Sequence, residues 1–138
     1  MKISTKGRYG LTIMIELAKK YGEGPISLKS IAQAHDLSEH YLEQLFSPLR
    51  NARLVKTTRG AYGGYVLANQ PANITAGDVI RVLEGPISVV EMIDEEAPAQ
   101  RQLWTRIRDA VQEVLDSTTL EDLVRYDQEN TGGYMFYI

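Results

Sequence analysis

The sequence contains no cysteine among its 138 residues. It therefore has no disulfide, no thiolate ligand for a metal or an iron–sulfur cluster, and no cysteine nucleophile. Only two histidines are present, His35 and His40, and neither lies in a metal-ligand spacing or beside a nucleophile. These absences argue against an enzyme, and the sequence predicts no metal and no cofactor.

Long apolar runs are also missing. Nothing approaches the ~18 continuous apolar residues that a membrane-spanning helix needs. The N-terminal stretch "MKISTKGRYGLTIMIELAKK" is basic, but polar residues interrupt it every few positions and no small-residue cleavage site follows. It therefore does not have the form of a signal peptide, and we expect a cytoplasmic protein.

Positive charge is scarce in the second half of the chain and concentrated in the first. Residues 1–70 carry 10 Lys and Arg against 5 Asp and Glu, whereas residues 71–138 carry 5 against 13. The net charges are +5 and −8, which give the total of −3. A basic front half and an acidic back half indicate two different tasks, the first of them contact with a polyanion.

The front half has the element order of a winged helix-turn-helix. Ser4, Ser27 and Ser38 are placed to cap three helices. The expected apolar stripes are Leu11, Met14, Ile15 and Ala18 in the first helix, and Leu42, Leu45, Phe46 and Leu49 in the third. Pro48 predicts a kink in the last turn of the third helix. Two short strands, 54–58 and 65–68, then enclose a glycine-rich tip.

The third helix would enter the major groove of DNA. Its start and its outward face carry side chains that can hydrogen-bond to bases or phosphates, and we predict DNA contacts from Ser38, His40, Tyr41, Glu43, Gln44 and Arg50. The alternative for this helix is an ordinary solvated face.

The stretch "TTRGAYGGY" (57–65) forms the expected wing, with Arg59 directed into a minor groove. A nucleotide-binding loop would need a different glycine spacing, a following helix and a lysine, so we disfavour it. A purely structural hairpin remains an alternative. Lys2, Lys6 and Arg8 gather at the start of the first helix and are predicted to bind phosphates, the alternative being a solubilising terminus.

The acidic half is predicted to be helical. Thr75 caps a helix whose apolar face is Val79, Ile80 and Leu83, and "DEEAPAQ" (94–100) follows as a polar loop. A long amphipathic helix then presents one stripe, made of Leu103, Ile107, Ala110, Val111 and Val114. We predict that so long a stripe packs against a second copy of the chain. The alternative is that the helix packs against its own domain.

A last short helix is predicted after a capping box of Thr118 and Glu121. Two glycines, Gly132 and Gly133, then predict a hinge before the apolar end "YMFYI". An apolar terminus indicates docking, either on the protein's own helices or on a partner.

These segments resemble a known family. "MKISTKGRYGLTIMIELA", "LSEHYLEQLFSPLRNARLV", "RGAYGGYVLA" and "ITAGDVIRVLEG" are similar to the bacterial winged-helix regulators that include the iron–sulfur regulator IscR and the nitric-oxide sensor NsrR. The resemblance covers nearly the whole chain. It implies a homodimer on a dyad-symmetric DNA operator, with Glu43 reading bases and Arg59 in the minor groove.

The resemblance also has a departure. Cluster-binding members carry three cysteines where this chain has "PISVVEMIDEEAPAQRQ", so sensing through a cluster is excluded. Within the family the chain is most similar to a repressor of cysteine-metabolism genes that also ends in "YMFYI". That likeness implies a cysteine synthase as partner, with Tyr137 and Ile138 as the binding residues.

The sequence thus predicts a mainly α protein with a small β-hairpin wing and a long dimerisation helix. Its expected units are a DNA-binding domain (1–70), a helical dimerisation and regulatory region (71–131) and a C-terminal tail (132–138). We expect a repressor of cysteine and sulfur metabolism genes at the bacterial nucleoid, not an enzyme. The alternatives are a winged-helix protein–protein interaction module and a regulator that senses a small ligand directly.

Overall fold

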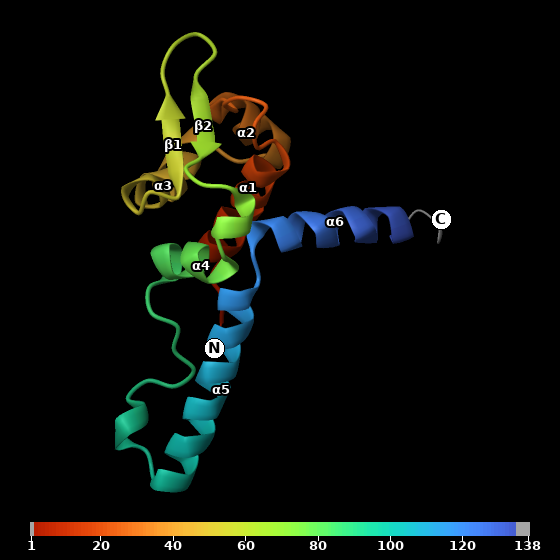
Figure 1. Ribbon diagram of the computed structural model, residues 1–138. Coiled ribbons are helices and arrows are strands. Elements are labelled where there is room, and N and C mark those ends of the chain that lie inside the picture. Colours follow the sequence, from red (N-terminus) through yellow and green to blue (C-terminus); the bar gives the residue numbers. More distant parts are fainter. Residues whose placement is uncertain (1, 135–138) are drawn as a thin grey trace.

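The computed structural model describes residues 2–134, with side chains up to residue 130. It confirms a mainly helical fold with one small hairpin (Figure 1). The helices are α1 (Thr5–Lys19), α2 (Leu28–His35), α3 (Glu39–Asn51), α4 (Ala76–Glu84), α5 (Pro98–Ser117) and α6 (Leu120–Tyr134). The strands are β1 (Val55–Thr58) and β2 (Gly64–Leu67), and two 3-10 turns are η1 (Pro71–Asn73) and η2 (Ile93–Glu95). Tyr137 and Ile138 lie outside the described residues.

Serine caps begin the first three helices, as the sequence predicts. The hydroxyl oxygens of Ser4, Ser27 and Ser38 each accept a hydrogen bond from the backbone N–H three residues later, at 3.3, 3.0 and 3.0 Å. Each bond satisfies an N–H that has no partner within its helix, so these residues fix where the helices start.

One hydrophobic core joins α1, α2, α3 and the hairpin. The predicted face of α3 is confirmed, because Leu42, Leu45, Phe46 and Leu49 are at most 1% exposed. The predicted face of α1 is partly wrong: Ile13 and Leu17 are buried, whereas Leu11 and Ile15 lie half-buried at its edge. The core also takes in residues from beyond position 70, namely Ile74, Val79, Leu83 and Leu120.

The wing is an antiparallel pair in which Val55 lies opposite Leu67 and Thr58 opposite Gly64. Tyr65 extends the pairing, because its backbone exchanges hydrogen bonds of 2.8 and 3.0 Å with that of Ile26. A Cβ at Gly64 would lie 2.2 Å from the carbonyl oxygen of Ile26, so only glycine allows this approach. At the tip Gly60 has a φ of +110°, which glycine adopts without a steric penalty.

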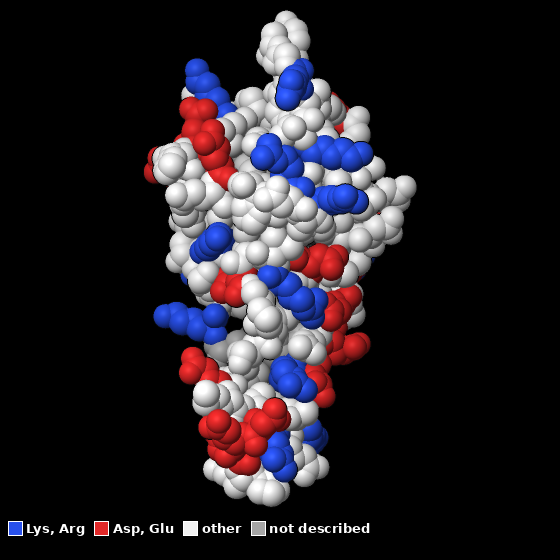
Figure 2. Space-filling view, turned by 90° about the vertical axis from the view of Figure 1, so that its left-hand side faces the viewer, with Lys and Arg blue, Asp and Glu red and all other residues white. Residues whose placement is uncertain are grey.

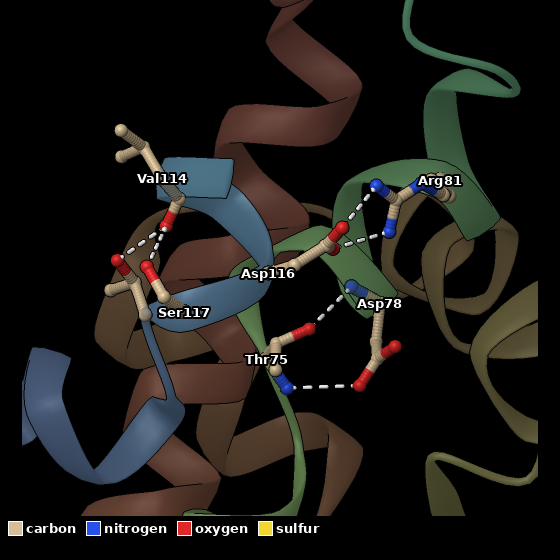
Figure 3. A network of polar contacts seen from close by, with 7 residues as sticks. Thr75, Asp78, Arg81, Val114, Asp116 and Ser117 are labelled. Carbon is tan, nitrogen blue, oxygen red and sulfur yellow. Dashed lines mark hydrogen bonds and ion pairs between the residues drawn. The ribbon is translucent and has the colours of Figure 1, made fainter. Parts of the chain in front are cut away.

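Helix α4 fastens the long helix α5 to the rest of the molecule (Figure 3). Thr75 and Asp78 form a capping box at the start of α4, as expected for a Thr75 cap. The Arg81 guanidinium donates two hydrogen bonds to the Asp116 carboxylate, at 2.6 and 2.9 Å, and this contact lowers the pKa of Asp116. This two-bond contact joins the end of α5 to α4 with a defined geometry.

The long helix α5 extends away from the core (Figure 1). It starts at Pro98 and η2 precedes it, so the prediction that 94–100 is a loop is wrong for most of that segment. Proline is well suited to the first turn of a helix, where its missing N–H costs nothing.

The last helix differs from its prediction in two ways. The capping box is formed by Thr119 and Asp122, through hydrogen bonds of 3.0 Å in both directions, and not by Thr118 and Glu121. Thr118 donates its hydroxyl proton to the Val114 carbonyl at 2.7 Å and so ends α5 instead. Helix α6 is also long, because its backbone continues through Gly132 and Gly133 to Tyr134, so no hinge lies at these glycines.

Candidate nucleic-acid interface

The second helix of the helix–turn–helix pair, α3, presents a polar outer face. We call five of its exposed side chains the reading surface: His40, Glu43, Gln44, Ser47 and Arg50. They lie opposite the buried leucines, because α3 turns one face to the core and the other to solvent. Gln44 and His40 are within hydrogen-bond distance, at 3.3 Å between their side-chain nitrogens. These groups offer both donors and acceptors, which reading base edges requires.

Helix α3 continues through Pro48 to Asn51. Proline has no N–H to donate to the Gln44 carbonyl, so one helical hydrogen bond is missing there. Three helical residues follow Pro48, and Arg50 is therefore carried on α3 as predicted.

Two further predicted contacts have structural roles at the start of α3. The Ser38 hydroxyl caps the helix, as described above. Tyr41 is half-buried, and its ring meets the ring of Tyr9 edge-on, with centroids 6.1 Å apart. Tyr41 therefore links α3 to α1 and has only part of its surface free for DNA.

The start of α1 lies beside the reading surface. A hollow of about 630 Å³ is lined by Lys6 together with Tyr41, Glu43, Gln44 and Ser47. Lys2, Lys6 and Arg8 are all exposed. The structure thus brings Lys6 next to the predicted base-reading residues, although more than thirty positions separate them in the chain.

The wing holds Arg59 in solvent at the tip of the hairpin, beyond the end of β1. Within the hairpin the ring of Tyr65, on β2, is stacked on the ring of Phe46, with centroids 3.9 Å apart and planes 12° apart. Phe46 belongs to α3, so this stack joins the wing to the helix that carries the reading surface. Sequence reasoning found Arg59 but not the stack, because no local pattern links residues 46 and 65.

Charge gathers where the interface is expected. Figure 2 shows Lys and Arg prevailing on this face at the height of the wing and the first three helices, apart from an acidic cluster near its left edge, and both signs mixed lower down over α4 and α5. The basic surplus of residues 1–70 is therefore also a feature of the folded surface, and such a surface attracts the phosphate backbone of DNA.

A helix–turn–helix with an exposed polar reading surface, a basic helix start and an arginine-tipped wing defines a winged helix-turn-helix DNA-binding protein. A family model described as Rrf2, iron-dependent transcriptional regulator, matches residues 3–126. The chain belongs to the Rrf2 family. It is a transcriptional regulator and not an enzyme, as the sequence predicts.

Individual relatives agree with this assignment. The chain is 75% identical over 138 residues to the HTH-type transcriptional regulator CymR of Bacillus subtilis strain 168, with all of both chains covered. It is 34% identical over 130 residues to IscR of Pectobacterium atrosepticum, covering 90% of this chain and 79% of that one.

Solved structures give the same result. The structure of CymR, described as the global cysteine regulator of B. subtilis, matches with a TM-score of 0.85 and 78% identity, covering 91% of this chain and 98% of that one. T. potens IscR matches with a TM-score of 0.81 and 47% identity, covering 99% of this chain and 97% of that one. The predicted resemblance to the IscR-type regulators is confirmed.

The family description names iron, but the residues present do not fit an iron site. The chain has no cysteine. Among the described residues, no group of three or more His, Asp or Glu side chains is placed to hold a metal ion. His35 and Glu16 bond to each other. Sensing through a thiolate-bound cluster is therefore excluded for this chain.

Over the described part of the chain, no helix combines the length and the apolar character needed to cross a bilayer.

Proposed function

We propose that this protein is a dimeric repressor that binds a dyad-symmetric operator and controls genes of cysteine and sulfur metabolism. The observation that carries the proposal is a relative of 78% identity with the same fold that is described as a global cysteine regulator. The exposed reading surface and Arg59 supply the means of binding DNA.

In this proposal each part of the interface has its own task. Glu43 and Gln44 read base edges in the major groove, Glu43 by accepting from a cytosine amino group and Gln44 by pairing with adenine. Arg59 enters the minor groove beside them, where the negative potential attracts a guanidinium. Lys2, Lys6 and Arg8 bind phosphates and supply affinity without sequence preference. Ser38, His40, Tyr41 and Arg50 complete the contact along α3.

The dimer of this proposal forms through α5. Leu103, Ile107 and Val114 are 47%, 37% and 63% exposed, Ala110 is exposed and Val111 is half-buried. The stripe is therefore not covered by the protein's own domain, which was the alternative. Val114 and Asp116 are two positions apart, which places them about 200° apart around a helix. Because Asp116 faces α4, the stripe faces away from it and is free to meet a second copy.

Selection of bound duplexes from random DNA tests the proposal. We expect a palindromic consensus for which the logarithm of the binding constant falls linearly with the logarithm of the salt concentration. Arg59→Ala should weaken binding to that consensus by about 1–3 kcal/mol without changing the dimer. Arg106→Ala, which removes an exposed arginine from α5, serves as the matched control and should bind like the unmodified protein. Equal affinities for both variants would refute the role of Arg59.

The proposed signal reaches the repressor through a cysteine synthase. Tyr137 and Ile138 lie outside the described residues, so this part rests on the sequence "YMFYI" and on the resemblance. An apolar side chain and a terminal carboxylate suit a pocket with backbone N–H donors. The synthase's own substrate would compete for that pocket and so release the repressor from the synthase.

Deletion of Ile138 is expected to abolish binding to the synthase while leaving operator affinity in the absence of the synthase unchanged. Calorimetric titration of the synthase into both forms measures the first property, and gel retardation the second. Unimpaired binding of the truncated form would show that the tail is not the docking segment.

A further inference from the structure

The start of α1 is held from the end of α4. The backbone N–H of Ser4 donates to Oε1 of Glu84 at 2.8 Å, and the Ser4 hydroxyl donates to the same oxygen. Ser4 is also the residue that caps α1, through its bond from the Gly7 N–H. A single carboxylate, eighty positions further along the chain, thus accepts two hydrogen bonds from the residue that caps α1.

Glycine makes room for this contact. A Cβ at Gly7 would lie 2.4 Å from Oε1 of Glu84, and a Cβ at Gly10 would lie 2.0 Å from Cδ1 of Leu83. The end of α4 therefore rests directly on the backbone of α1 over one helical turn. A side chain at position 7 would force the Glu84 carboxylate to shift from its present place beside Ser4.

The position of Glu84 is electrostatically unfavourable for DNA binding. Its carboxylate bonds to Ser4, and Ser4 stands in the chain between Lys2 and Lys6, where phosphates are expected. A negative charge there should repel DNA. If Glu84 acts only as a charge, removing it should strengthen DNA binding. If it organises the lysines, removing it should weaken DNA binding.

We infer that Glu84 is a positioning residue for DNA binding, an inference that rests on the proposed function. It orders the segment around Ser4, so that Lys2, Lys6 and Arg8 meet phosphates while α3 meets the bases. Ordering these side chains before binding lowers the entropy lost in the complex. The same helix, α4, is tied to α5 through Arg81 and Asp116, so the phosphate-binding segment is placed relative to the dimerisation helix as well.

Two substitutions at one position separate the two effects. Glu84→Gln removes the charge but keeps an oxygen that accepts from Ser4, whereas Glu84→Ala removes both. We expect Glu84→Ala to weaken operator binding about tenfold and to lower the salt slope by about one unit, because fewer phosphates are contacted. Glu84→Gln should bind at least as tightly as the unmodified protein.

A third variant keeps the carboxylate and displaces it. Gly7→Ala places a methyl group where Glu84 now lies, while alanine favours the helix by about 1 kcal/mol over glycine. It should therefore fold at least as well and still lose affinity like Glu84→Ala. Fluorescence anisotropy with a labelled operator at several salt concentrations measures all the variants, and thermal unfolding checks that each is folded.

The outcomes are distinguishable. Tighter binding by Glu84→Ala would mean that Glu84 is only a repulsive charge, and equal loss in Glu84→Ala and Glu84→Gln would mean that the charge itself is needed. Either result overturns the inference. Lys6→Ala is the parallel arm: if it weakens binding while Glu84→Ala does not, the inference fails and the proposed interface stands. If Lys6→Ala and Arg8→Ala both leave affinity and salt slope unchanged, the proposed phosphate contacts themselves fail.

Discussion

Ile107→Glu is expected to give a monomer that binds a two-half-site operator at least about a hundredfold more weakly, because linking two binding modules is worth a factor of about 10² to 10⁴. Ile107 lies in the middle of the exposed α5 stripe, between Leu103 and Val114. In a symmetric dimer its side chain and that of the second copy would both be buried. A glutamate there would place two unpaired carboxylates in an apolar contact, which is strongly unfavourable.

Sedimentation equilibrium measures the expected change in mass, and anisotropy with full and single half-site duplexes measures the change in affinity. Affinity for a single half-site should hardly change, because α3 and the wing are untouched. Gln102→Glu introduces the same charge at an exposed position of α5 off the stripe and should leave the dimer intact. A dimeric Ile107→Glu protein would disprove the assignment of α5.

The other large effect concerns stability. Phe46→Ala is expected to lower the free energy of unfolding by about 3–5 kcal/mol, as for other phenylalanines removed from a core. Phe46 is 1% exposed, and its ring stacks on Tyr65. Its loss leaves a cavity between α3 and the wing and uncovers one face of Tyr65. Since the free energy of unfolding of a domain is only about 5–15 kcal/mol, this substitution should remove a large part of it.

Urea unfolding followed by circular dichroism measures this loss. Tyr62→Ala is the matched control, because it removes an aromatic ring that is 93% exposed at the tip of the same wing. Its free energy of unfolding should change by no more than about 0.5 kcal/mol. Similar values for the two variants would show that the stack of Phe46 on Tyr65 contributes little.

Local signals in the sequence predicted much of the fold. A serine cap followed by apolar residues at helical spacing placed α1, α2 and α3, because both signals arise within one or two turns. The buried face of α1 was misjudged since two of its members, Gly7 and Gly10, are not apolar and leave no trace in a hydrophobic pattern. For α6 the sequence "STTLED" offers two capping boxes one residue apart, and the end of α5 decides between them by using Thr118.

For the candidate site, the sequence predicted which side chains are exposed but not the contacts that hold them in place. The side chains of the reading surface and Arg59 follow from which face of a helix is polar and from where a hairpin turns. The contacts that hold them in place do not, because the Phe46–Tyr65 stack and the Ser4–Glu84 bond join residues far apart in the chain. The only sequence signal of the second contact is a pair of glycines three positions apart in α1.

The place of Leu120 in the core has a consequence for synthesis. This residue is fully buried together with Ile13, Leu42 and Val79, and it belongs to α6. During synthesis the N-terminus leaves the ribosome first. The residues of α1, α2, α3 and the wing therefore emerge long before Leu120, which completes their core. A nascent chain reaches its final stability only after all of α5 has been made. In the proposed dimer, the helix that meets the second copy has therefore been synthesised before this core is complete.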